Sequence, residues 1–82
     1  MTAAQGQKPA EIVAIGCLAK SGQNFDLKDY RSGAVHRLEA KAEMIEWHVG
    51  HKIEVRGTVL GVAQDVTRVK VESVSYISST CS

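Results

Sequence analysis

Two histidines, His48 and His51, stand in the stretch H-V-G-H near the middle of this 82-residue chain. Imidazole nitrogens are common zinc ligands, but a zinc site needs three or four ligands that converge tetrahedrally. This stretch supplies two, and His36 is the only other histidine. We therefore expect no metal and no cofactor, and treat His48 and His51 as weak metal candidates.

The same stretch is interpreted as the end of a helix that is followed by a strand. Gly50 stands where a left-handed cap would end a helix, and alternating residues follow it. We expect His48 to pack in an apolar arc with a ring nitrogen bonded to the backbone. His51 is then expected to reach the last carbonyl groups of the helix.

Catalytic arrangements are not recognisable elsewhere in the sequence. Serines crowd the C-terminal region, but none stands in a G-x-S-x-G elbow. The carboxylates alternate with apolar residues, which places them on exposed strand faces, without the burial that acid–base chemistry needs. We predict that the protein is not an enzyme.

The two cysteines, Cys17 and Cys81, are far apart in the sequence, and neither belongs to a C-x-x-C motif. A disulfide between them would stabilise the fold by roughly 4 kcal/mol, comparable with the whole stability of so small a domain. Such a bond persists in an oxidising compartment, so this interpretation implies export to the periplasm or secretion. Two reduced, buried cysteines in a cytosolic protein are the alternative.

The chain length predicts one domain. The first ten residues, MTAAQGQKPA, are small and polar and contain no apolar core of a signal peptide. We expect residues 1–10 to be a disordered segment ahead of a single domain at residues 11–82. No apolar run is long enough to cross a bilayer, so we expect a soluble protein without a membrane partner.

The charge pattern argues against a polyanionic partner. The formal net charge is +1, and acidic and basic residues alternate within the same segments, as in K-I-E-V-R. Nucleic-acid-binding proteins usually carry a basic stripe, which is missing here. Nucleic acid is therefore not the expected partner.

A period of two residues, which is typical of strands with one buried face, dominates the sequence. It predicts five strands, at residues 11–19, 24–29, 34–40, 52–60 and 67–78, with a loop at 61–65. Gly16 would permit a bend in the first strand. The apolar parity shifts at Val74 and Ile77, which predicts a bulge in the last strand.

Between the third and fourth predicted strands, residues 41–50 change to a helical period. On a helical wheel Met44, Ile45, Trp47 and Val49 spread over a broad apolar arc, which would plug the bottom of a barrel. This order of elements predicts an all-β protein with one short helix, a five-stranded barrel like the oligonucleotide/oligosaccharide-binding (OB) fold. An SH3-like barrel is the alternative.

The sequence resembles a family of small exported bacterial OB-fold proteins that is known only as a domain of unknown function. The similarity rests on G-C-L at residues 16–18, on F-x-L at 25–27, on H-V-G-H leading into a strand that ends at Gly57, and on I-S-x-T-C at 77–81. It covers about residues 12–82. The resemblance implies the OB fold, an exported mature form and pairing of Cys17 with Cys81, but no activity. His36 stands where the family more often has tyrosine, so no role of that side chain is carried over.

The function that we expect is non-catalytic binding of an unidentified small molecule or protein by a monomer or a weak homodimer. OB barrels bind ligands on the second and third strands and the flanking loops, where the candidate ligand-binding residues are Lys28, Tyr30, Arg31 and Arg37. A single-stranded nucleic-acid-binding OB domain is the alternative. Such domains present aromatic rings on these strands, whereas the residues expected to face outward here include none.

Overall fold

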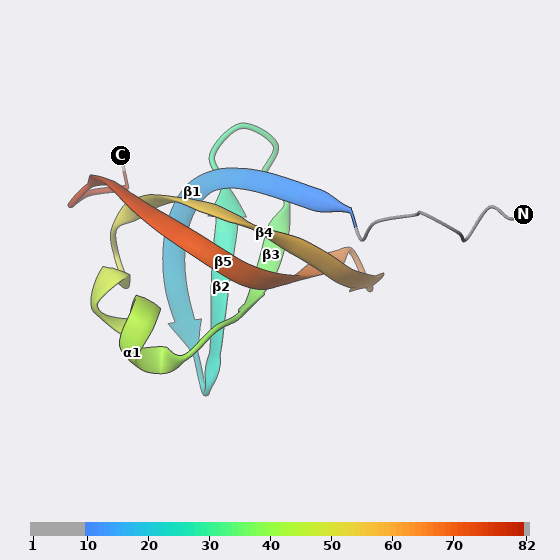
Figure 1. Ribbon diagram of the computed structural model, residues 1–82. Coiled ribbons are helices and arrows are strands. Elements are labelled where there is room, and N and C mark those ends of the chain that lie inside the picture. Colours follow the sequence, from blue (N-terminus) through green and yellow to red (C-terminus); the bar gives the residue numbers. More distant parts are fainter. Residues whose placement is uncertain (1–9, 82) are drawn as a thin grey trace, which may run out of the picture.

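The computed structural model describes residues 10–81 and contains one mostly β domain with a short helix (Figure 1). In chain order the elements are β1 (Glu11–Ser21), β2 (Asn24–Asp29), β3 (Val35–Glu39), α1 (Ala42–Ile45), the 3-10 turn η1 (Glu46–His48), β4 (Lys52–Ala63) and β5 (Val66–Ser78). This order confirms the predicted class and the predicted sequence of elements. The prediction of disorder for residues 1–10 concerns residues that, apart from Ala10, lie outside the described range. No helix in the described range is long and apolar enough to cross a membrane.

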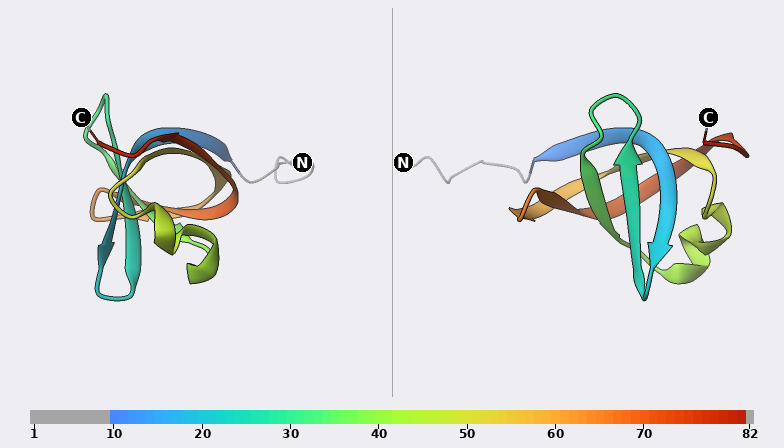
Figure 2. Two further views of the ribbon diagram at one scale, coloured as in Figure 1. Left: turned by 90° about the vertical axis from the view of Figure 1, so that its left-hand side faces the viewer. Right: turned by 180° about the vertical axis from the view of Figure 1, so that it is seen from behind.

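The five strands close into a ring in the order β1-β2-β3-β5-β4, with β4 pairing back onto β1 (Figure 2). All neighbours are antiparallel except β3 and β5, which run parallel. Each strand therefore has a partner on both sides. A ring of this kind leaves no complete sheet edge free for pairing with another chain.

The strand β1 bends strongly, as predicted at Gly16 (Figure 1). Its first part pairs with β4 and its last part with β2, while Gly16 and Cys17 pair with both neighbours. A Cβ atom at Gly16 would overlap the carbonyl oxygen of Lys28, so the two backbones can approach here only because the side chain is absent. The side chains of β1 that point away from the core are partly exposed, and Val13 is the most exposed large apolar residue among them.

The predicted alternation places the apolar residues of the strands inside the ring. Nine residues form the buried core: Ala14, Leu18, Phe25, Leu27, Leu38, Ile45, Ile53, Val55 and Val69. Eight of them come from strands, and Ile45 comes from α1 and closes the bottom of the core. Buried residues alternate along β2, β3 and the first half of β4, as the period of two predicts.

The helical segment departs from the predicted broad apolar plug. Of its apolar side chains only Ile45 is buried, while Met44, Val49 and especially Trp47, which is 65% exposed, face outward. The reason is that the helical segment is short, because α1 tightens into a 3-10 turn at Glu46 that ends at His48. Ile45 and His48, three residues apart, share the buried face, whereas Trp47 lies on another face and Val49 lies beyond the turn.

The β4–β5 hairpin is longer and tighter than predicted. Residues 61–65 are not a loop, because pairing continues to Ala63 and Val66 across a two-residue turn. Gln64 and Asp65 form this turn with φ angles of 54° and 66°, the conformation of a type I′ hairpin, in which glycine or asparagine is usual. The absence of that sequence signal explains why the turn was missed.

The last strand contains the predicted irregularity. The register shifts on β5 leave Glu72 and Ile77 without a partner on β4. These two bulges lie where the apolar parity shifts at Val74 and Ile77. The extra residue at Glu72 moves the following side chains to the opposite face, so that Val74 and Tyr76 lie opposite Val55 and Ile53 of β4.

Candidate functional site

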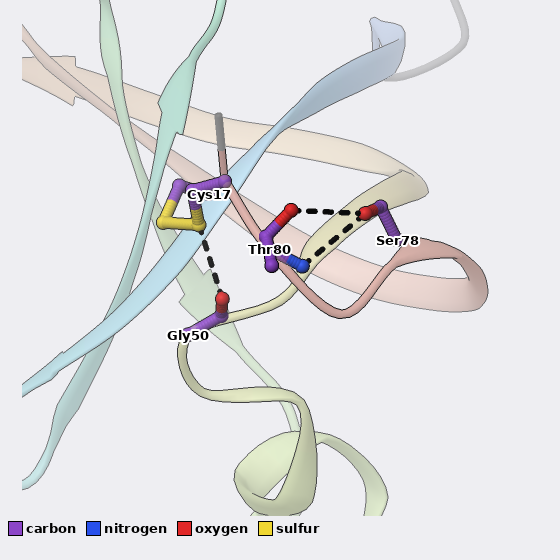
Figure 3. The surroundings of a disulfide bond; sticks show 5 residues. Cys17, Gly50, Ser78 and Thr80 are labelled. Atoms are coloured by element: carbon purple, nitrogen blue, oxygen red, sulfur yellow. Dashed lines mark hydrogen bonds between the residues drawn. A yellow bond between two sulfur atoms is a disulfide. The ribbon is translucent and has the colours of Figure 1, made fainter.

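A disulfide joins Cys17, at the bend of β1, to Cys81, which follows β5 (Figure 3). The two Cα atoms are 5.4 Å apart and the cysteines are separated by 64 positions. The predicted pairing is confirmed, and the alternative of two reduced cysteines is wrong. The backbone N–H of Thr80 donates a hydrogen bond to Oγ of Ser78 at 3.2 Å, which turns the final segment back towards Cys17.

The H-V-G-H stretch is fastened to β1 next to the disulfide. The Gly50 N–H donates to the Leu18 carbonyl at 2.8 Å, and the Leu18 N–H donates to the His51 carbonyl at 3.1 Å. Gly50 has a φ of 89°, which confirms the left-handed position predicted to end the helix. Its carbonyl oxygen lies 3.2 Å from Sγ of Cys81. Three segments that are distant in the sequence therefore meet at this end of the ring.

A row of three side chains crosses the outer surface at the disulfide. Cys17 lies directly opposite Lys28 of β2 on one side and opposite Lys52 of β4 on the other. Residues directly opposite each other on neighbouring strands point to the same face of a sheet. Because strands are spaced by about 4.8 Å, the two lysine backbones are about 10 Å apart, and their long side chains flank the disulfide.

This row lines a pocket of about 290 Å³ on the surface of the ring. Its lining residues are Cys17, Lys28, Asp29, Tyr30, Gly33, Lys52 and Cys81. Neither Lys28 nor Lys52 forms a salt bridge with any residue in the range 10–81. The pocket thus combines two ammonium groups without a carboxylate partner there and the apolar sulfur atoms of the disulfide.

Tyr30 forms the aromatic wall of the pocket and holds one of the lysines. Tyr30 is 55% exposed, and Nζ of Lys52 lies 4.5 Å from the centroid of its ring. An ammonium group at this distance is attracted by the negative face of the ring. The Tyr30 N–H donates to the Ile15 carbonyl at 3.1 Å, so the backbone that carries the ring is fixed to β1.

Asp29 is the acidic residue of the pocket, and its carboxylate is already used in the β2–β3 turn. Oδ1 of Asp29 accepts hydrogen bonds from the N–H groups of Arg31 at 2.8 Å and Ser32 at 3.0 Å. These two backbone bonds hold the pKa of Asp29 below its usual value. Asp29 therefore stays ionised near neutral pH and shapes the loop that carries Tyr30.

The four predicted ligand-binding residues do not form one cluster. Lys28 and Tyr30 line the pocket, whereas Arg31 places its guanidinium 5.5 Å from the Tyr30 ring. Arg37 points elsewhere, because it forms a two-bond ion pair with Asp26 at 3.0 and 3.3 Å. The hydrogen bond from Arg37 to Asp26 raises the pKa of the guanidinium. Lys52 was not predicted as a site residue, because it comes near Lys28 only through the pairing of β4 with β1 that closes the ring.

Beside the pocket lies a cluster of four rings, Trp47, His48, His51 and Tyr76. Nδ1 of His48 is 3.4 Å from Nδ1 of His51, so this ring nitrogen faces the other histidine and not the backbone. Burial, and then the neighbouring His51, lower the pKa of His48. Between residues 10 and 81, no three histidine, cysteine or acidic side chains gather as a potential metal site. The exposed rings of Trp47 and Tyr76 were not identified as site residues from the sequence.

Comparison of the chain with protein-family models, with curated proteins and with solved structures found no match.

Proposed function

We propose that the protein is an exported, non-catalytic binding module with an OB-like barrel, and that its pocket beside the disulfide takes a small anionic molecule. The observation that carries the proposal is the row Lys28–Cys17–Lys52. It presents two ammonium groups on either side of one concave, partly apolar surface. A phosphate or carboxylate group above the disulfide would be within reach of both lysines.

The ring topology supports the OB-like assignment over the SH3-like alternative. Two helical turns, α1 and η1, stand between β3 and β4, whereas an SH3-like barrel carries at most a single turn in that position. The parallel pairing of β3 with β5 closes a ring of five strands, as a Greek-key barrel of the OB type requires. The resemblance to the exported OB family points in the same direction.

The disulfide supports the proposed location. A bond that closes a loop of this length in so small a domain makes a large part of its stability depend on oxidation. Reducing compartments would remove that part. The disulfide is therefore a reason to propose the periplasm or the outside of the cell.

The chemistry of the pocket supports binding rather than catalysis. Its volume lies near the lower end of the range for small-molecule sites, which runs from about 300 to 1,000 Å³. Asp29 is committed to the turn, both cysteines are oxidised, and Tyr30 holds Lys52. The remaining functional groups are the two ammonium groups, which suit the recognition of a negative charge.

Single-stranded nucleic acid is less well supported as a ligand. The β2–β3 face on which OB domains usually stack bases carries the Arg37–Asp26 ion pair, and both of its charges are satisfied within the protein. The Tyr30 ring lies at its margin, and Lys52 lies over that ring. Whether the protein is a monomer or a weak homodimer stays a prediction from the sequence.

The proposal is tested with phenyl phosphate, which carries both a dianion and a ring. Backbone amide shifts in NMR spectra of the full chain would be followed during titration, with benzyl alcohol as the neutral control compound. We expect saturable shifts at residues 28–33 and 52, and an affinity that falls as salt is added. The variant K28Q/K52Q should lose most of the affinity.

The matched control is K41Q/K70Q, which lowers the net charge by the same two units and changes two exposed lysines outside the pocket. This variant should bind phenyl phosphate as the unmodified protein does. Equal losses in both variants would show a non-specific charge effect and contradict the proposal. Tighter binding of a labelled oligonucleotide, with shifts on the β2–β3 face, would favour the nucleic-acid alternative.

A further inference from the structure

We propose that His48 and His51 form a chelating pair for one divalent transition-metal ion. Their two Nδ1 atoms face each other at 3.4 Å. A metal that binds two imidazoles at about 2.05 Å with a tetrahedral angle requires these nitrogens to be about 3.3 Å apart. The side chains therefore hold the spacing of such a pair without any movement of the backbone.

A hydrogen bond between the two rings is the simpler explanation of this contact, but the distance suits it less well. Hydrogen bonds from N–H groups to oxygen are usually 2.7–3.2 Å long, and the 3.4 Å between the two nitrogens is at the long end for such a bond. One ring would also have to keep its proton on Nδ1. When a metal replaces that proton, both nitrogens become ligands at the distance already present.

The backbone and the neighbouring rings hold the two imidazoles in place. The His51 N–H donates to the His48 carbonyl at 2.8 Å. The Trp47 ring lies 3.8 Å from the His48 ring with a tilt of 32°, and the Tyr76 ring lies 6.2 Å from it with a tilt of 29°. Because His48 packs against both rings, little side-chain freedom is left to lose when the pair binds a metal.

The donor set also indicates the class of metal. Imidazole suits zinc, copper and nickel, whereas magnesium and calcium prefer oxygen ligands. His48 and His51 supply two ligands, and no third histidine, cysteine or acidic residue of the described range joins them. The remaining coordination positions would be filled by water or by groups of another molecule, so the ion stays open to external ligands.

The test uses the metal alone, added to the full chain after treatment with a chelator. Trp47 is the only tryptophan, and its ring lies 3.8 Å from that of His48, so bound Cu²⁺ should quench its fluorescence. Calorimetric titration with ZnCl₂ and CuSO₄ should give one metal ion per chain. NiCl₂ should broaden the NMR signals of residues 47–51 more strongly than any others.

Two variants separate the pair from histidine content in general. H51Q changes the less buried partner and should abolish the quenching and the calorimetric signal, whereas H36Q, which changes the remaining histidine, should keep both. Circular dichroism checks that each variant is folded. If a variant is not folded, the NMR broadening caused by NiCl₂ in the unmodified protein still tests the proposal. Absence of saturable binding, unchanged binding by H51Q, or nickel broadening centred elsewhere would each overturn the proposal.

Discussion

The two ends of the ring are built differently. At one end, the disulfide, the H-V-G-H stretch and the pocket bring together β1, β2, β4 and the segment after β5. At the other end, the tip of the β4–β5 hairpin extends away from the ring (Figure 1). That tip is formed by the β4–β5 hairpin, with Val62 68% exposed, and Val66 beside the turn also pairs with Val35 of β3.

The difference shows at which end of this small domain the long-range contacts are concentrated. The hairpin end depends mainly on the pairing of β4 with β5, and residues 62–65 are exposed. The disulfide end fixes four separate segments, and the same contacts aim two lysines and two imidazoles at neighbouring positions. Rigid placement of polar groups on elements fixed from several sides is what a binding site requires.

Removal of the disulfide should cause the largest loss of unfolding free energy, and the loss should come from the disulfide end. The variant C17S/C81S should lose roughly 4 kcal/mol of unfolding free energy, because the unfolded chain regains the freedom that the bond restricts. Urea unfolding followed by circular dichroism measures this loss, with T80A as a control on the same segment. An unfolding free energy within about 1 kcal/mol of the unmodified protein would contradict the assigned role of the bond.

Glycine substitutions compare the two ends directly. G16A should cost about 3 kcal/mol, because the added Cβ would overlap the Lys28 carbonyl, which belongs to the backbone and cannot turn aside. G61A, on β4 near the hairpin tip, adds a Cβ with no neighbour within 4 Å, so we expect a change below about 0.5 kcal/mol. Thermal unfolding of both variants gives the two values. Equal costs would show that β1 and β2 can separate at the bend.

The smallest expected effect is the pH dependence of the unfolding free energy, which comes from His48 at the disulfide end. The pKa of His48 in the folded protein lies below its ordinary value of 6.5, first through burial and then through His51. The unfolded chain therefore binds more protons in acid than the folded one, and unfolding free energy should fall as the pH drops below about 6.5. The lowered pKa of Asp29 acts in a separate range, below about 3.8.

Urea unfolding at pH 7.5 and pH 5.0, with a chelator present, measures this dependence. H48F removes the titrating group and keeps a ring between Trp47 and Tyr76, so its stability should change less between the two pH values. A variant that loses as much stability as the unmodified protein would assign the acid sensitivity to other groups.

The sequence predicted the strands and the core because alternation of apolar residues depends on local spacing. The roles of Gly16 and Gly50 and a bulge in the last strand were also predictable, since glycine positions and a parity shift are local signals. The helical plug was wrong because four residues of α-helix followed by a 3-10 turn do not follow the period of a longer helix.

The candidate site was only half predicted, for a reason that lies in the topology. Lys28 and Tyr30 stand near each other in the chain, but Lys52 joins them only because β1 lies between β2 and β4 and places Cys17 opposite both lysines. The facing nitrogens of His48 and His51 likewise depend on side-chain directions that a spacing of three residues does not fix.

The most direct measurement is a crystal structure of the oxidised protein with phenyl phosphate. The proposed function predicts phosphate oxygens within hydrogen-bonding distance of Nζ of both Lys28 and Lys52, above the Cys17–Cys81 bond. Phenyl phosphate bound at the hairpin tip or on the β2–β3 face, with both ammonium groups left in solvent, would contradict it.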